Sequence, residues 1–131
     1  MLLAAVLAAA DVSFVLVGSA ALWLRGEAMP VGDTDAVIEP REPNLRRLHA
    51  ALNSLAVRPR QVPSVSRLRG LPIARVMTSF GNLDCLLEQG RLEWGRLRGG
   101  AETIMVTDVG VLVASAGDAW ALRRRFKDGH G

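Results

Sequence analysis

The hydrophobic and polar positions form short apolar runs and helix-spaced patterns in turn, which is typical of a mixed α/β chain. Residues 2–10 are rich in alanine and leucine and predict a short helix, and the run SFVLV at 13–17 predicts a buried strand. Residues 19–26 predict a second helix, with Ser19 as a candidate N-cap and Gly26 as the stop. The order strand, glycine turn, helix directs free backbone N–H groups toward whatever binds above the turn.

The middle of the chain continues this alternation. The segment DTDAVIE at 33–39 predicts a second strand, and residues 42–55 predict a helix whose leucines at 45, 48, 52 and 55 share one face. Residues 57–72 contain three prolines and several arginines, so we expect a loop there.

Two hairpins are predicted in the last part of the chain, one around Phe80-Gly81 and one around TDVG at 107–110. Residues 90–100 between them are polar and glycine-rich and predict a turn or a short helix, and residues 117–126 predict a final helix. The fold class is therefore α/β (or α+β), with a short mixed β-sheet and flanking helices. A length of 131 residues indicates one domain over 1–131.

The N-terminal 24 residues are apolar enough to suggest a membrane span. Asp11 interrupts them midway, where a charge in lipid is costly, and no basic segment precedes the apolar stretch. A buried helix followed by a buried strand explains the same residues, so we expect a soluble protein without a membrane partner. We also expect Trp23, on the helix after the glycine turn, to be a core residue.

The charge and the cysteine content limit which binding partners and which cellular compartment we expect. The net charge is +3 and Lys127 is the only lysine, so arginine supplies nearly all the positive charge. Arginine suits bidentate phosphate contacts, which allows a nucleic-acid or nucleotide partner, although a solvated arginine-rich surface explains it equally simply. Cys85 is the only cysteine, which excludes an internal disulfide and fits a cytoplasmic setting. With only two histidines, a histidine-rich zinc site is not expected.

Asp33 and Asp35 stand one residue apart at the start of an apolar strand. On a strand these two side chains point to the same face, so the carboxylates repel and one pKa should rise unless cations intervene. Divalent hard cations such as Mg²⁺ prefer oxygen ligands and would relieve this repulsion. The alternative is that Asp33 caps a turn after Gly32 while Asp35 lies at an exposed strand edge.

Asp84 adds a third carboxylate in the middle of the apolar strand NLDCLLE. An aspartate there is disfavoured by propensity and costly to bury without partners. If this strand lies beside that of Asp33 and Asp35, three carboxylates converge and could hold two metal ions against a triphosphate. Gly18 and Ser19 would then hold the phosphates. Cys85 should point to the opposite face and be a buried apolar residue.

These motifs, in this order, resemble those of the nucleotidyltransferases of the DNA polymerase β superfamily. The matching elements are Val17-Gly18-Ser19, Asp33-Thr34-Asp35 and Leu83-Asp84-Cys85. The chain is most similar to the small bacterial members of the minimal and abortive-infection (AbiEii-like) toxin type. Relatives often continue past the last helix, which indicates a domain truncated after residue 128.

The resemblance implies a polymerase-β-like fold and a metal-dependent transfer of a nucleoside monophosphate from an NTP to a hydroxyl. Asp33, Asp35 and Asp84 would bind two Mg²⁺ ions, or Mn²⁺, and Asp84 would also activate the hydroxyl. Gly18, Ser19 and Arg123 would bind the nucleotide, with Arg123 replacing the usual lysine. The acceptor would be an RNA or tRNA end, a protein or a small molecule, and an antitoxin or a second copy of the chain would be a further partner.

Two other interpretations stay open. The chain could be a catalytically weak or inactive nucleotidyltransferase-like domain that binds RNA or acts in a toxin–antitoxin pair. It could also be a purely structural domain in which the aspartates form turns.

Overall fold

The structure, a computed structural model, describes residues 1–122. Its first half contains α1 (Leu2–Ala9), β1 (Phe14–Val17), α2 (Gly18–Leu24), β2 (Thr34–Ile38) and α3 (Glu42–Leu55). Its second half contains the 3₁₀ helix η1 (Pro59–Gln61), α4 (Val65–Leu68), β3 (Ile73–Thr78), β4 (Gly81–Leu86), α5 (Leu87–Gly100), β5 (Glu102–Val106) and β6 (Val109–Val113). Residues 116–122 are helical as well.

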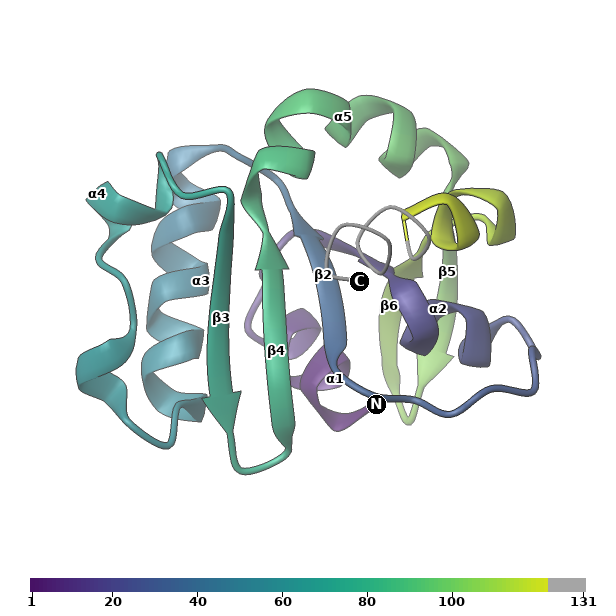
Figure 1. Ribbon diagram of the computed structural model, residues 1–131, viewed down its shortest axis with the longest axis horizontal. Helices are drawn as coiled ribbons and strands as arrows, with labels where there is room; N and C mark the ends of the chain where they lie inside the picture. The colour runs from purple at the N-terminus through teal and green to yellow at the C-terminus, as the bar shows by residue number, and fades with distance from the viewer. Residues whose placement is uncertain (123–131) are drawn as a thin grey trace, which may run out of the picture.

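One six-stranded sheet organises these elements, in the order β3-β4-β2-β1-β6-β5 (Figure 1). The pairs β3–β4, β2–β1 and β6–β5 are antiparallel, whereas β4–β2 and β1–β6 are parallel. The sheet is therefore mixed and has helices beside it, which confirms the predicted fold class. The two predicted hairpins are β3–β4 and β5–β6.

The burial pattern shows which face of the sheet is open. All four residues of the central strand β1 are buried, whereas β3 alternates buried positions with exposed ones. In Figure 1, α1 and α3 lie on one side of the sheet, and the buried residues of β3 share one face of the strand. The exposed positions, Arg75 and Met77, therefore lie on the opposite face, which is less covered at this edge.

Helix α3 coincides with the predicted helix over 42–55, and its four leucines are buried. Asn44 is completely buried and fixes the start of the helix to the sheet. Its side chain accepts a hydrogen bond from the Ser13 N–H (2.7 Å) and donates to the carbonyls of Ser13 and Glu39 (both 2.9 Å). These bonds satisfy backbone groups next to β1 and β2, which would be costly to bury unpaired.

Of the turn or short helix predicted for residues 90–100, the structure contains the helix, as part of the 14-residue α5, which packs on β2 despite its glycines. Two local predictions were wrong. Part of the predicted loop 57–72 forms two short helices, η1 and α4. Trp23 is not a core residue, since it is 50% exposed on the outer side of α2.

Within residues 1–122, no helix is both long and apolar enough to cross a membrane.

Candidate active site

The turn between β1 and α2 shapes one end of the site. Gly18 adopts φ +71°, a left-handed conformation that L side chains rarely adopt, and the helix begins at this residue. Ser19 is therefore not the N-cap as predicted. Val17 holds that position, and no side chain caps the helix. The helix ends as predicted, because Gly26 (φ +96°) donates to the Trp23 carbonyl and Glu27 to that of Leu22, a Schellman motif.

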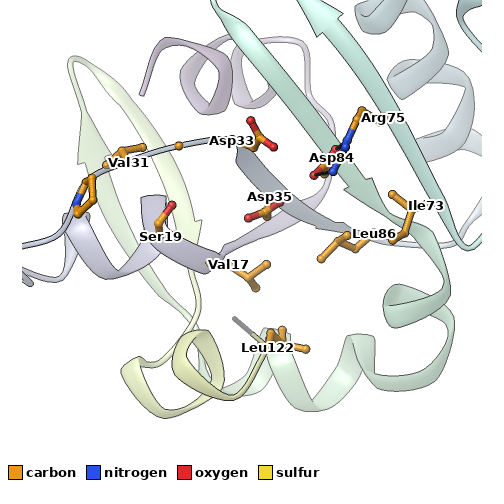
Figure 2. Close-up of a pocket in the computed structure, with 13 residues that line it drawn as sticks. Val17, Ser19, Val31, Asp33, Asp35, Ile73, Arg75, Asp84, Leu86 and Leu122 are labelled. Carbon is orange, nitrogen blue, oxygen red and sulfur yellow. Dashed lines mark hydrogen bonds and ion pairs between the residues drawn. The ribbon is translucent and has the colours of Figure 1, made fainter. Parts of the chain in front are cut away.

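The parallel pairing of β2 with β4 brings the three carboxylates together. Asp35 is the register partner of Asp84, so the two side chains leave neighbouring strands at the same level. Asp33 precedes β2 by one residue and lies two residues before Asp35, on the same face. Figure 2 shows all three carboxylates facing one cavity. The predicted convergence of the three carboxylates required these two strands to be neighbours, and β2 and β4 are indeed adjacent.

Burial and like charge determine the protonation of this cluster. The pKa of Asp35 is raised to about 7, first by burial and then by the negative charges of Asp84 and Asp33. The rise expected for one of two paired carboxylates is thus confirmed, and it falls on Asp35. Without a bound cation, Asp35 is therefore partly protonated at neutral pH, which reduces the repulsion within the cluster.

Arg75 is a site residue that the sequence reasoning missed. In the β3–β4 hairpin it is the register partner of Asp84. Its Nε donates to Asp84 Oδ1 (2.7 Å) and its Nη2 donates to Asp84 Oδ2 (3.0 Å), a bidentate ion pair. The Arg75 side chain is 62% exposed and that of Asp84 only 10%. The predicted turn at Phe80-Gly81 would have placed position 75 opposite position 86, whereas the observed turn at residues 79–80 pairs Thr78 with Gly81 and therefore Arg75 with Asp84.

The cavity beside these residues has a volume of about 420 Å³. One part is polar and contains the Gly18-Ser19 turn and the three aspartates (Figure 2). The other part is apolar and includes Ile73, Leu86 and Leu122. The full lining is Val17, Gly18, Ser19, Pro30, Val31, Gly32, Asp33, Asp35, Ile73, Arg75, Asp84, Leu86 and Leu122.

The donor set suits a hard divalent cation in its chemistry, because carboxylate oxygens are the ligands that such ions prefer. As the side chains stand, no three carboxylate, histidine or cysteine groups of residues 1–122 are arranged to hold a metal ion. Asp84 contributes to this, since both of its oxygens are bonded to Arg75. The oxygens of Asp33, Asp35 and Asp84 are the donors that a cation would use here, and the Asp84 oxygens keep further lone pairs beside their bonds to Arg75.

Five of the six predicted site residues line this cavity: Gly18, Ser19, Asp33, Asp35 and Asp84. The sixth, Arg123, lies outside the described residues. Cys85 is completely buried on the opposite face of β4 from Asp84, as expected, and burial together with the charge of Asp84 raises its pKa to about 12.

A comparison with solved structures finds the same architecture in a crystal structure described as a putative nucleotidyltransferase from Thermotoga maritima. The TM-score is 0.62 at 14% sequence identity, and the match covers 92% of this chain and 77% of that one. The fold is nucleotidyltransferase-like. No protein-family profile and no curated protein matches the chain. The match supports the nucleotidyltransferase fold implied by the sequence motifs, but it does not support the abortive-infection toxin type in particular.

Proposed function

We propose that this protein is a Mg²⁺-dependent nucleotidyltransferase that transfers a nucleoside monophosphate from an NTP to a hydroxyl acceptor. The observation that carries the proposal is the convergence of Asp33, Asp35 and Asp84 on one cavity whose other end is the Gly18-Ser19 turn. Three carboxylates in a half-buried cluster are costly without cations. A fold shared with a nucleotidyltransferase-like structure lends further support.

Each side chain has a role in the transfer. The N–H groups of the Gly18-Ser19 turn and the Ser19 hydroxyl bind the outer phosphates of the NTP. Asp33, Asp35 and Asp84 would hold two Mg²⁺ ions or, alternatively, Mn²⁺, and the ions would supply positive charge against the phosphates. The hydroxyl oxygen of the acceptor forms a bond to the α-phosphorus while its proton passes to the Asp84 carboxylate. The bond from the α-phosphorus to the bridging oxygen breaks, and pyrophosphate leaves with that electron pair.

We infer that Arg75 releases Asp84 when Asp84 serves as a ligand or accepts a proton. The exposure of the arginine side chain allows this, since its outer part is held only through Asp84 among residues 1–122. Once released, the guanidinium remains at the rim of the cavity, where a phosphate is a suitable new partner. Arg75 thus holds Asp84 in place until substrate and cation enter.

Calorimetric titration of each NTP with Mg²⁺ tests the proposal without knowledge of the acceptor. Native protein should bind at least one NTP in a Mg²⁺-dependent manner, and the double variant Asp33→Ala/Asp35→Ala should not bind it. The variant Asp108→Ala is a matched control, because it removes an exposed carboxylate in the β5–β6 turn, outside the cavity. Equal NTP binding by the native chain and the double variant would refute the site.

The Arg75–Asp84 pair favours a second candidate, in which the domain binds RNA or an antitoxin, or pairs with a second copy, without turnover. In that case the ion pair would be permanent and Asp84 would never bind a cation. This function predicts RNA binding that survives Asp33→Ala, together with no affinity for any NTP. The same calorimetric titration separates the two candidates.

A further inference from the structure

A second cavity, of about 150 Å³, lies on the other side of Arg75, between η1 and the edge strand β3. Its polar lining consists of Arg58, Gln61 and Arg75. We propose that it binds a phosphate group of the acceptor, namely a phosphodiester of a single-stranded polynucleotide whose terminal hydroxyl reaches Asp84. The role of that hydroxyl rests on the proposed function, whereas the phosphate site itself does not.

The position of this cavity follows from the strand order. The Gly18-Ser19 turn follows β1, the carboxylates belong to β2 and β4, and Arg75 belongs to β3 at the edge of the sheet. A triphosphate bound at the turn therefore occupies one side of the carboxylates and leaves the β3 side to the acceptor. Arg75 lines both cavities, so a phosphate in the second one lies next to the hydroxyl position at Asp84.

The charge of the cavity suits an anion. No carboxylate is among its lining residues within the described chain. The side chains of Arg58 and Gln61 form no hydrogen bond or ion pair with any other residue of 1–122, and Arg75 Nη1 is likewise not engaged there. Arg69, by contrast, is paired with Glu42. Arginine donors without a protein partner, gathered around a hollow, match the oxygens of a phosphate.

The surroundings favour a polynucleotide over a small phosphorylated molecule. The positive surface continues outward along η1 to Arg60, which also has no polar partner among residues 1–122. Large apolar side chains are exposed nearby on β3 and its turn, with Met77 64% and Phe80 54% exposed. A row of cations beside apolar surface is the arrangement that binds successive phosphates and bases of a single strand. A small acceptor would use only the innermost arginines.

The test is fluorescence anisotropy of a labelled single-stranded RNA decamer with a free 3′-hydroxyl, titrated with the full chain at several salt concentrations. Arg58→Gln is the first variant, because Arg58 is exposed and unpartnered and its loss should leave the fold intact, which a thermal melt verifies. Arg98→Gln, an equally exposed arginine on α5 that lines neither cavity, is the matched control. Inorganic phosphate and a mononucleotide serve as competitors.

Arg58→Gln should weaken RNA binding about fivefold or more and Arg58→Gln/Arg60→Gln further, while Arg98→Gln binds as the native chain does. The slope of log affinity against log salt should become shallower by about 0.7 for each arginine removed. Equal affinities of Arg58→Gln and Arg98→Gln, or no RNA binding by the native chain, would overturn the proposal. Competition by inorganic phosphate as effective as that by the decamer would overturn the polynucleotide assignment.

The NTP titration described under Proposed function is independent of Arg58. NTP binding without an Arg58-dependent RNA site would refute this inference alone. An Arg58-dependent RNA site without NTP binding would refute the nucleotidyltransferase proposal and leave the phosphate site standing.

Discussion

Gly18 lies directly against the carboxylate of Asp35, so that a Cβ at position 18 would collide with Asp35 Oδ2. The contact arises because Val17, the last residue of β1, is the register partner of Asp35. The Gly18-Ser19 turn and the carboxylate cluster are therefore adjacent parts of one cavity. A side chain at position 18 would fill the space that a phosphate and a cation would share.

Replacing Gly18 by alanine should destabilise the protein by more than about 1 kcal/mol, because a left-handed conformation is costly for any residue with a Cβ. The collision with Asp35 adds to this cost. Thermal or urea unfolding of Gly18→Ala, Asp35→Ala and the double variant separates the cost of the left-handed conformation from the cost of the collision with Asp35. We expect a smaller penalty for Gly18→Ala in the Asp35→Ala background, and an unchanged penalty would show that the contact is relaxed in solution.

Replacing Asp35 by asparagine should stabilise the ligand-free protein, increasingly so as pH rises. The folded-state pKa of Asp35, about 7, lies above its ordinary value of 3.8, so the folded state binds more protons between these values. The raised pKa therefore adds to the free energy of unfolding of the native protein. This added stability is fully present below about pH 4 and is lost as pH rises through 7. At pH 8 the gain for Asp35→Asn is at most about 4 kcal/mol, since one pKa unit corresponds to about 1.4 kcal/mol.

Urea unfolding of both proteins from pH 4 to pH 8 checks this prediction for Asp35. The difference in unfolding free energy should grow with pH and should shrink when Mg²⁺ and a bound NTP neutralise the native cluster. A difference that stays constant over this range would contradict the raised pKa.

Two glycines of α5 should respond in opposite ways to alanine. A Cβ at Gly90 would collide with the Ile38 carbonyl of β2, whereas a Cβ at Gly95 would meet nothing within 4 Å. Gly90→Ala should therefore destabilise the fold by roughly 1–3 kcal/mol through overpacking. Gly95→Ala should stabilise it by roughly 0.5–1 kcal/mol through helix propensity. Unfolding curves of the two variants test the packing of α5 on β2. Equal changes in unfolding free energy for the two variants would contradict this packing.

The Cys85 thiol should be almost unreactive in the folded protein. It is completely buried, and its pKa is raised to about 12, so little thiolate forms at pH 8. Labelling with a thiol-specific reagent should be rapid in denaturant and slow in buffer, where it reports opening of β4. A bound NTP with Mg²⁺ should slow it further, because a ligand of the native state suppresses opening. Rapid labelling of native protein would contradict the placement of Cys85.

The sequence was sufficient for elements whose local signals agree with their packing. The leucine spacing of α3 and the alternation around Phe80-Gly81 predicted a helix and a hairpin that the structure contains. The i, i+2 spacing of Asp33 and Asp35 predicted a shared face and a raised pKa. In these segments the spacing of similar residues along the chain directly indicates which face of the helix or strand they share.

Where sequence reasoning failed, tertiary contacts decided the outcome. The glycines of residues 90–100 left a turn or a short helix open, and packing selects the helix, because Gly90 lets α5 approach the β2 backbone. Trp23 was assigned to the core by residue type, but it lies on the exposed side of α2. Arg75 carried no motif of its own, and only the hairpin register places it opposite Asp84.

The Arg75–Asp84 pair also has a kinetic consequence. The two residues are nine positions apart within one hairpin, whereas Asp35 reaches Asp84 only through a long-range parallel pairing of β2 with β4. Hairpins form in about 1–10 μs, ahead of such non-local pairings. Stopped-flow refolding of Arg75→Gln should therefore be slower than that of the native chain, while equal rates would show that the pair forms late. Asp84 then reaches β2 with its charge already paired to Arg75, which lowers the electrostatic cost of adding a third carboxylate to the cluster during folding.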